Sequence, residues 1–131
     1  MMDKLQAKET VARTYLEAVG NKDLDTVMSL LSPDVTFVGP VMSLKGATEV
    51  VESLKRISAI HVRNDLKRIF VDADEVCVIY DFVTDTVGSV STVEWLSLAG
   101  CRIQSVRLYY DQLPWQKLRL LLAERSKRAP A

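Results

Sequence analysis

Residues 76–86 read VCVIYDFVTDT and are apolar at odd-numbered and even-numbered positions alike. One set holds Val76, Val78, Tyr80 and Phe82, and the other holds Cys77, Ile79 and Val83. Successive side chains of a β-strand point to opposite faces, so a strand of this kind is buried on both sides. The stretch therefore predicts a central strand, with the core on one face and a second cover on the other.

Further strands are predicted on both sides of this stretch. From residue 60 apolar positions alternate with polar ones, and the apolar set is Ile60, Val62, Leu66 and Phe70. Residues 72–75 form a turn, and Val87-Gly88 offers a two-residue hairpin turn. Later strands are predicted at 90–96 and 102–110, separated by a turn at 99–100. This order predicts an antiparallel meander.

The first third of the chain has a helical period instead. Val11, Tyr15 and Val19 recur at four-residue spacing, which predicts a helix ending at Gly20-Asn21. A second helix is expected to end before Pro33, followed by a short strand at 34–38 and a third helix after Gly46. Helices segregated from strands indicate an α+β domain, and a sheet curled around the helices would leave a cone-shaped cavity.

The length of the chain fits a single domain over residues 1–131, since domains run to roughly 100–200 residues. Pro114 ends the last predicted strand, and residues 115–131 are predicted to be a C-terminal tail with a short helical stretch at 118–122.

Charge and composition exclude several classes of function. Seventeen basic residues balance seventeen acidic ones, which favours neither nucleic acid nor a membrane surface as a partner. No apolar run approaches the roughly 18 residues of a membrane span, and neither cysteine requires a disulfide, so a cytoplasmic location is expected. His61 is the only histidine, has the parity of the polar positions and is expected to be solvated; neither a metal site nor a cofactor is predicted.

The chain contains five short motifs: Tyr15-Leu16-Glu17-Ala18-Val19 with Lys22-Asp23-Leu24, Asp34-Val35-Thr36-Phe37 leading to Gly39-Pro40, Leu44-Lys45-Gly46, Val93-Glu94-Trp95, and Arg102-Ile103-Gln104 through Tyr109-Tyr110-Asp111. With them the chain resembles the nuclear transport factor 2-like superfamily, which includes SnoaL-like polyketide cyclases and ketosteroid isomerases. The resemblance extends from residue 11 to about 114. It implies the cone-shaped fold, with three N-terminal helices on a curved sheet, and leaves the function open because this fold has many functions.

The resemblance also implies roles for single residues. Tyr15 matches the tyrosine that hydrogen-bonds the developing oxyanion in ketosteroid isomerases, Glu94 the acid that shares this role, and Tyr110 an aromatic residue of the pocket wall. The proton-shuttling aspartate of those enzymes is replaced by Gly39, and an acidic position of limonene epoxide hydrolases by Leu108. Both departures argue against these two activities in their usual form.

Asp81 interrupts the apolar stretch and has the parity of Ile79 and Val83. If that parity faces the cavity, the carboxylate is desolvated and has the raised proton affinity of a general base. If it faces outward, or if Arg63 or Arg107 pairs with it, Asp81 has a structural role only.

Glu94 would lie directly opposite Asp81 if residues 87–88 form the whole hairpin turn. Two carboxylates at close range repel, so one would hold a proton and serve as a hydrogen-bond donor. A slip of one residue in register would destroy the pair. Together with Tyr15, these residues form the predicted catalytic set. The predicted pocket lining is Tyr110, Leu108, Val106, Gly39, Met42, Leu54 and Ile79.

The leading functional hypothesis is a SnoaL-like enzyme that performs cofactor-free acid/base chemistry of the isomerase, cyclase or hydrolase type on a small apolar ring or carbonyl compound. The alternative is a non-catalytic module for ligand binding or dimerisation. Trp95 and the second apolar face of the central strand predict a homodimer through the outer face of the sheet.

Overall fold

The computed structural model describes residues 3–128, except for the side chains of Leu122 and residues 125–128. Three helices form in the first half of the chain: α1 (Lys4–Gly20), α2 (Leu24–Leu30) and α3 (Ala47–Ile57). The Asp3 carboxylate accepts a hydrogen bond from the Gln6 backbone N–H and the Gln6 side chain accepts one from Asp3, a capping box that starts α1. The Asp23 carboxylate caps α2 by accepting a hydrogen bond from the backbone N–H of Thr26.

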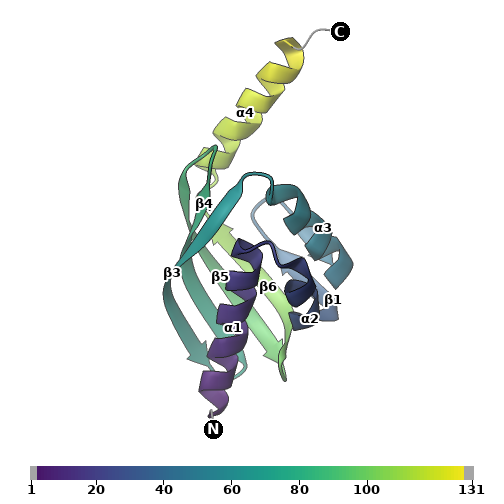
Figure 1. Cartoon of the computed structure of the whole chain (residues 1–131), viewed down its shortest axis with the longest axis vertical. Helices are drawn as coiled ribbons and strands as arrows, with labels where there is room; N and C mark the ends of the chain where they lie inside the picture. The colour runs from purple at the N-terminus through teal and green to yellow at the C-terminus, as the bar shows by residue number, and fades with distance from the viewer. Residues whose placement is uncertain (1–2, 129–131) are drawn as a thin grey trace.

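Six strands form one sheet in the order β2-β1-β6-β5-β4-β3. Their bounds are β1 (Leu31–Val38), β2 (Ser43–Lys45), β3 (His61–Asp72), β4 (Glu75–Thr84), β5 (Ser89–Ala99) and β6 (Arg102–Tyr110). All neighbours are antiparallel except β1 and β6. The helices lie on one face of the curved sheet (Figure 1), which is the predicted α+β arrangement of the nuclear transport factor 2-like fold.

The core lies between the helices and the inner face of the sheet. On β4, Val76, Val78 and Tyr80 are at most 4% exposed, whereas Cys77 and Ile79 are only half-buried. The even-numbered residues of β4 therefore face the helices, where they join Leu16 of α1 in one cluster. The odd-numbered residues form part of the outer face of the sheet.

The hairpin between β4 and β5 has a longer loop than predicted. The last paired residues are Val83 and Ser89, so the loop spans residues 84–88 rather than 87–88 alone. Thr84 closes it by donating from its backbone N–H and its hydroxyl to the carbonyl of Gly88. The register between β4 and β5 therefore differs from the predicted register by an odd number of residues. Residues of the two strands that were predicted to share a face consequently lie on opposite faces.

Two irregularities in β3 also change the predicted faces. The register with β4 shifts between His61 and Arg63 and again between Leu66 and Arg68. Phe70 was predicted to be buried but is 49% exposed on the outer face. His61, predicted to be solvated, is 2% exposed, hydrogen-bonds to Asn64 through Nε2 and stacks on the ring of Phe82. A bulge adds a residue to one strand, so strict alternation fails across it.

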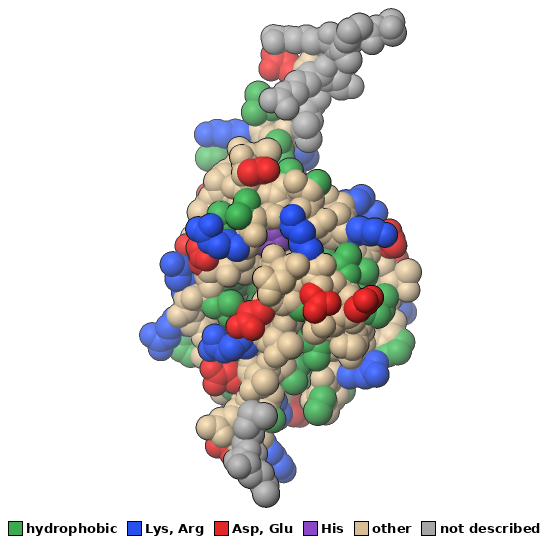
Figure 2. Space-filling view, viewed as in Figure 1, with side chains coloured by type: hydrophobic (Ala, Val, Ile, Leu, Met, Phe, Trp, Pro, Cys, Tyr) green, Lys and Arg blue, Asp and Glu red, His purple; other side chains and the backbone are tan. Residues whose placement is uncertain are grey.

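The predicted tail is a helix up to residue 128; residues 129–131 lie outside the described part of the chain. This helix, α4 (Leu113–Arg128), begins immediately before Pro114 because proline is tolerated in the first turn of a helix. Its first turns lie near the end of the sheet and the rest extends away from the body (Figure 1). Within residues 3–128, no helix has the combination of length and hydrophobicity that a membrane span needs. Figure 2 shows basic and acidic side chains interspersed over the visible face.

Candidate functional site

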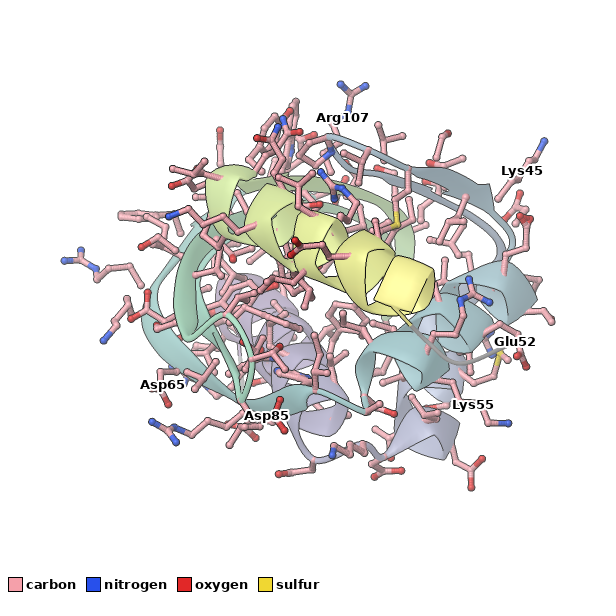
Figure 3. All side chains as sticks on the ribbon, turned by 90° about the horizontal axis from the view of Figure 1, so that it is seen from above. Lys45, Glu52, Lys55, Asp65, Asp85 and Arg107 are labelled. Atoms are coloured by element: carbon pink, nitrogen blue, oxygen red, sulfur yellow. The ribbon has the colours of Figure 1, made fainter. Side chains whose placement is uncertain are left out.

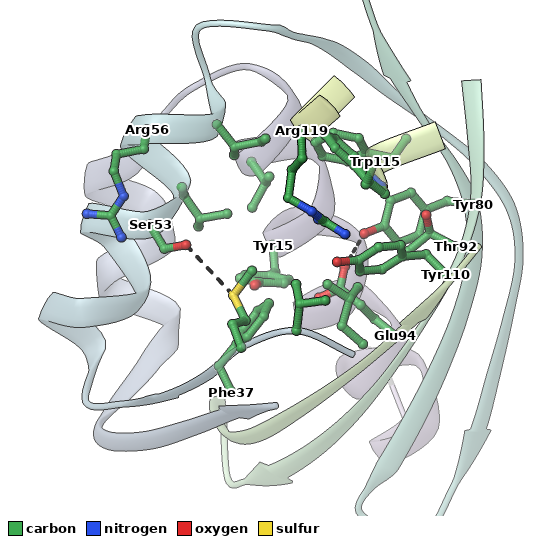
Figure 4. Close-up of a pocket in the computed structure, with 17 residues that line it drawn as sticks. Tyr15, Phe37, Ser53, Arg56, Tyr80, Thr92, Glu94, Tyr110, Trp115 and Arg119 are labelled. Carbon is green, nitrogen blue, oxygen red and sulfur yellow. Dashed lines mark hydrogen bonds between the residues drawn. The ribbon is translucent and has the colours of Figure 1, made fainter. Parts of the chain in front are cut away.

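A cavity of about 380 Å³ lies between the helices and the inner face of the sheet. Its wall is mainly apolar and comes from α1, β1, α3, the sheet and α4 (Figure 4). Its polar and aromatic lining residues include Tyr15, Ser53, Arg56, Tyr80, Thr92, Glu94, Tyr110, Trp115 and Arg119. A concave apolar site with a few convergent polar groups is the usual form of a small-molecule site.

Glu94 is the only carboxyl-bearing residue among the described lining residues. It lies on β5 opposite Val78, a pairing that turns its side chain to the inner face, and it is 4% exposed. The Tyr80 hydroxyl donates a hydrogen bond to Oε2 at 2.5 Å, while Oε1 has no partner in the described structure. Burial raises the pKa of Glu94 to about 7, against the opposing effect of the Tyr80 hydrogen bond. The group can therefore both lose and regain a proton near neutral pH.

Two tyrosines surround this carboxyl group. Tyr15 of α1 is 1% exposed and Tyr80 of β4 is 4% exposed. Burial raises the pKa of both hydroxyls well above the usual value, and the charge of Glu94 adds to the effect. Both tyrosines therefore remain protonated and are hydrogen-bond donors at neutral pH. Both tyrosines line the same cavity as Glu94.

The mouth of the cavity is formed partly by α4. The Trp115 ring meets the Tyr110 ring edge-on, with centroids 6.1 Å apart, and lies 5.9 Å from Phe82. Trp115 and Arg119 are one helical turn apart and therefore share the face of α4 that lines the cavity. Figure 4 shows both residues above the cluster of Tyr80, Tyr110 and Glu94.

The structure places the predicted catalytic residues differently. Tyr15 and Glu94 line the cavity. Asp81 does not: it belongs to the odd-numbered residues of β4, pairs with Ser91 instead of Glu94, and lies 3.5 Å from Lys67 Nζ on the outer face. Its predicted position in the cavity is therefore wrong, because the even-numbered residues of β4 pack against the helices, and the longer hairpin loop separates Asp81 from Glu94.

Among the predicted lining residues, Tyr110, Leu108, Met42 and Leu54 line the cavity. Ile79 was expected there but has the outward parity of Asp81. Val106 is fully buried in the core and does not reach the cavity surface. Gly39 lies behind the wall, in a separate surface hollow formed by the ends of β1 and β6.

Gly39 has room for a side chain. A Cβ atom there would lie 3.6 Å from Met42 Cγ and 3.7 Å from Leu108 Cβ, which are ordinary contacts, and its φ is not positive. We expect Gly39→Ala to raise the free energy of unfolding by about 0.4–1 kcal/mol, because alanine restricts the unfolded chain. Urea unfolding measures this, and a loss of stability would mean that the backbone near Met42 needs glycine.

Tyr80, Thr92, Trp115 and Arg119 also line the cavity and were not predicted. Tyr80 could have been predicted from residues 76–86, because it is one of the even-numbered residues, and these form the inner face of β4. Trp115 and Arg119 had no comparable signal because their segment reads as a tail. In the described part of the chain, no three histidine, cysteine, aspartate or glutamate residues gather to hold a metal ion.

Comparison with known proteins agrees with this architecture. The family model described as the SnoaL-like domain matches residues 12–106. A protein from Kribbella flavida DSM 17836 superimposes with a TM-score of 0.81 and 25% identity over 88% of this chain and 95% of that one. An NTF2-like protein of unknown function from Cytophaga hutchinsonii has a TM-score of 0.75 and 17% identity over 88% and 98%. An LEH-like epoxide hydrolase from M. tuberculosis has a TM-score of 0.75 and 20% identity over 95% and 99%.

The two likenesses below 25% identity show the fold alone. No curated protein matches the sequence of this chain. The family model, however, covers more than half of the chain and both residues, Tyr15 and Glu94, of the site. The protein therefore belongs to the SnoaL-like domain family and has the nuclear transport factor 2-like fold.

Proposed function

We propose that this protein binds a small, largely apolar carbonyl compound and catalyses proton transfer at the carbon next to the carbonyl group, with Glu94 as the acid/base. The observation that carries the proposal is the Glu94 carboxyl group, which is buried in an apolar cavity and whose Oε1 has no partner among the described residues. A buried oxygen without a partner costs free energy, so its retention in a cavity is typical of a functional group.

The proposed reaction needs no redox partner. Oε1 of ionised Glu94 takes a proton from the α-carbon, and the C–H electron pair moves into the carbonyl group to form an enolate. The enolate oxygen accepts a hydrogen bond from the Tyr15 hydroxyl, which stays protonated because burial raises its pKa. Glu94 then returns the proton to the same carbon or to a conjugated one. Tyr80 holds the carboxyl group in place through Oε2.

The cavity limits the size of the compound. A cavity of about 150 Å³ is large enough for benzene, so about 380 Å³ suits one or two six-membered rings. Because most of the wall is apolar, the ring system would bind by the hydrophobic effect and the carbonyl group by a hydrogen bond from the Tyr15 hydroxyl.

A binding protein without turnover is the second candidate. One observation favours it: Glu94 is the single carboxyl group in the described lining, so no second acid is present to divide the proton transfers. In that role, neutral Glu94 and the two tyrosines would orient a ligand by hydrogen bonds.

Hydrogen–deuterium exchange separates the two candidates. A panel of small ring ketones is incubated with the protein in D₂O, and loss of the α-proton signal is followed by NMR. We expect an exchange rate that increases with pH, has its midpoint at about pH 7 and then levels off, because Glu94 must lose its proton to act as the base. Asp81→Asn, on the outer face, should have no effect. A ketone that binds without any exchange above the rate in buffer would support the binding protein instead.

A further inference from the structure

Arg119 carries a positive charge above the cavity. Trp115 anchors the start of α4 against Tyr110 and Phe82, and Arg119 follows one turn later on the same face. Figure 4 shows its guanidinium group directed toward the cluster of Tyr80, Tyr110 and Glu94. Burial raises the pKa of Tyr110, and the charge of Arg119 opposes that rise, so the guanidinium acts on the cavity wall.

This guanidinium group has no acidic partner in the described structure. The four ion pairs there join Lys8, Arg13, Arg63 and Lys67 to acids elsewhere. Arg56 of α3, the other cation among the described lining residues, has no ion pair with any described residue either. Glu94, the one acid among the described lining residues, is buried at the base of the cavity and is bound by Tyr80. The two ends of the cavity therefore differ in charge. A carboxyl group lies inside, and at the mouth lies positive charge that no described acidic residue neutralises.

From this arrangement we propose that Arg119 determines specificity by binding an anionic group of the ligand, so that the natural ligand class is a small oxo acid with an apolar ring. The carboxylate of the ligand would lie at the mouth and its carbonyl group would point inward to Tyr15 and Glu94. This inference rests on the proposed function and narrows its substrate class.

The chemistry of the two groups favours this orientation over the reverse. A guanidinium group donates two parallel hydrogen bonds to a carboxylate, a pairing that lysine cannot reproduce. Ionised Glu94 would repel a carboxylate placed at the base of the cavity. Because Arg119 is exposed, we expect its pairing to be screened by salt and to have a moderate effect on affinity.

Two matched probes test the inference: 4-oxocyclohexane-1-carboxylate and its uncharged methyl ester. We expect the carboxylate to bind the full-length protein about tenfold more tightly than the ester, as measured by calorimetry at low salt. Arg119→Gln should remove this difference by weakening only the carboxylate, and Arg119→Lys should restore part of it. Lys117→Gln on the same helix and Lys55→Gln on α3, whose side chain points outward (Figure 3), are the matched charge controls and should have no effect.

The outcomes separate this inference from the proposed function. If both probes undergo α-proton exchange and bind equally, in wild type and in Arg119→Gln, Arg119 has no role in specificity and the proposed function stands. If the advantage of the carboxylate depends on Arg56 and survives Arg119→Gln, the assignment to Arg119 is wrong. If neither probe nor any other ring ketone binds, the proposed function fails and this inference fails with it.

Discussion

Replacing Glu94 with glutamine is expected to raise the free energy of unfolding at pH 8 by about 3 kcal/mol. The pKa of this carboxyl group rises from 4.5 to about 7 on folding, so the folded protein holds a proton that the unfolded chain has lost. The stability that comes from this proton is complete below pH 4.5 and is lost as the pH rises through about 7. Glutamine never ionises, so the variant avoids this loss.

Urea unfolding at pH 5 and pH 8 measures the effect. The variant and the wild type should differ strongly at pH 8 and little at pH 5. Glu52→Gln, an exposed change on α3, is the control and should give no such pH dependence. Equal stability at pH 8 would mean that Glu94 ionises without cost and is not desolvated as the structure indicates.

The same variant should lose α-proton exchange by about 10²–10⁴-fold, the usual contribution of a general base. Gain of stability together with loss of activity is typical of a group kept for function at a cost to the fold. If exchange persisted at the wild-type rate, another group would have to be the base.

Tyr15→Phe is expected to lower the exchange rate by about 10²–10³-fold, the effect of removing one hydrogen-bond donor from an oxyanion. The Tyr15 hydroxyl is the proposed donor to the enolate, and the phenylalanine ring would fill the same buried space. Affinity for the ketone should change much less, because the hydrogen bond strengthens mainly as negative charge develops.

The measurement compares kcat and KM for exchange in Tyr15→Phe with those in Tyr109→Phe, which removes the hydroxyl of a residue that is 50% exposed on the outer face. A fall in kcat in the first variant alone supports the assignment. A rise in KM with unchanged kcat would instead give Tyr15 a role in ground-state binding, and would transfer the donor role to Tyr80.

The sequence predicted the fold well because its strongest signals are local. Four-residue spacing of Val11, Tyr15 and Val19 predicted α1, and the apolar stretch at 76–86 predicted β4, of which only the even-numbered face packs into the core. Resemblance to a known family supplied the arrangement of these elements. Faces could be assigned only where alternation is unbroken. The shift between Leu66 and Arg68 therefore reversed the prediction for Phe70.

The site was predicted only in part, and the reason is register. Tyr15 and Glu94 were found through resemblance and line the cavity. Asp81 was chosen because a carboxylate stood out in an apolar strand, but the faces of β4 depend on the length of the loop at 84–88 and on which set packs against α1. Neither the length of this loop nor the face that packs against α1 can be read from the local sequence. The role of α4 at the mouth depends likewise on contacts of Trp115 with residues distant in the chain.

The two tryptophans lie in separate environments, so the intrinsic fluorescence of the protein can be used to follow ligand binding. Trp115 stands at the mouth of the cavity, whereas Trp95 is 37% exposed on the outer face beneath the Arg107 guanidinium. In a Trp95→Phe variant, all indole fluorescence would come from the mouth. Ligands that are transparent at the excitation wavelength could then be titrated without a label, and the emission maximum would report how far water is displaced from the opening.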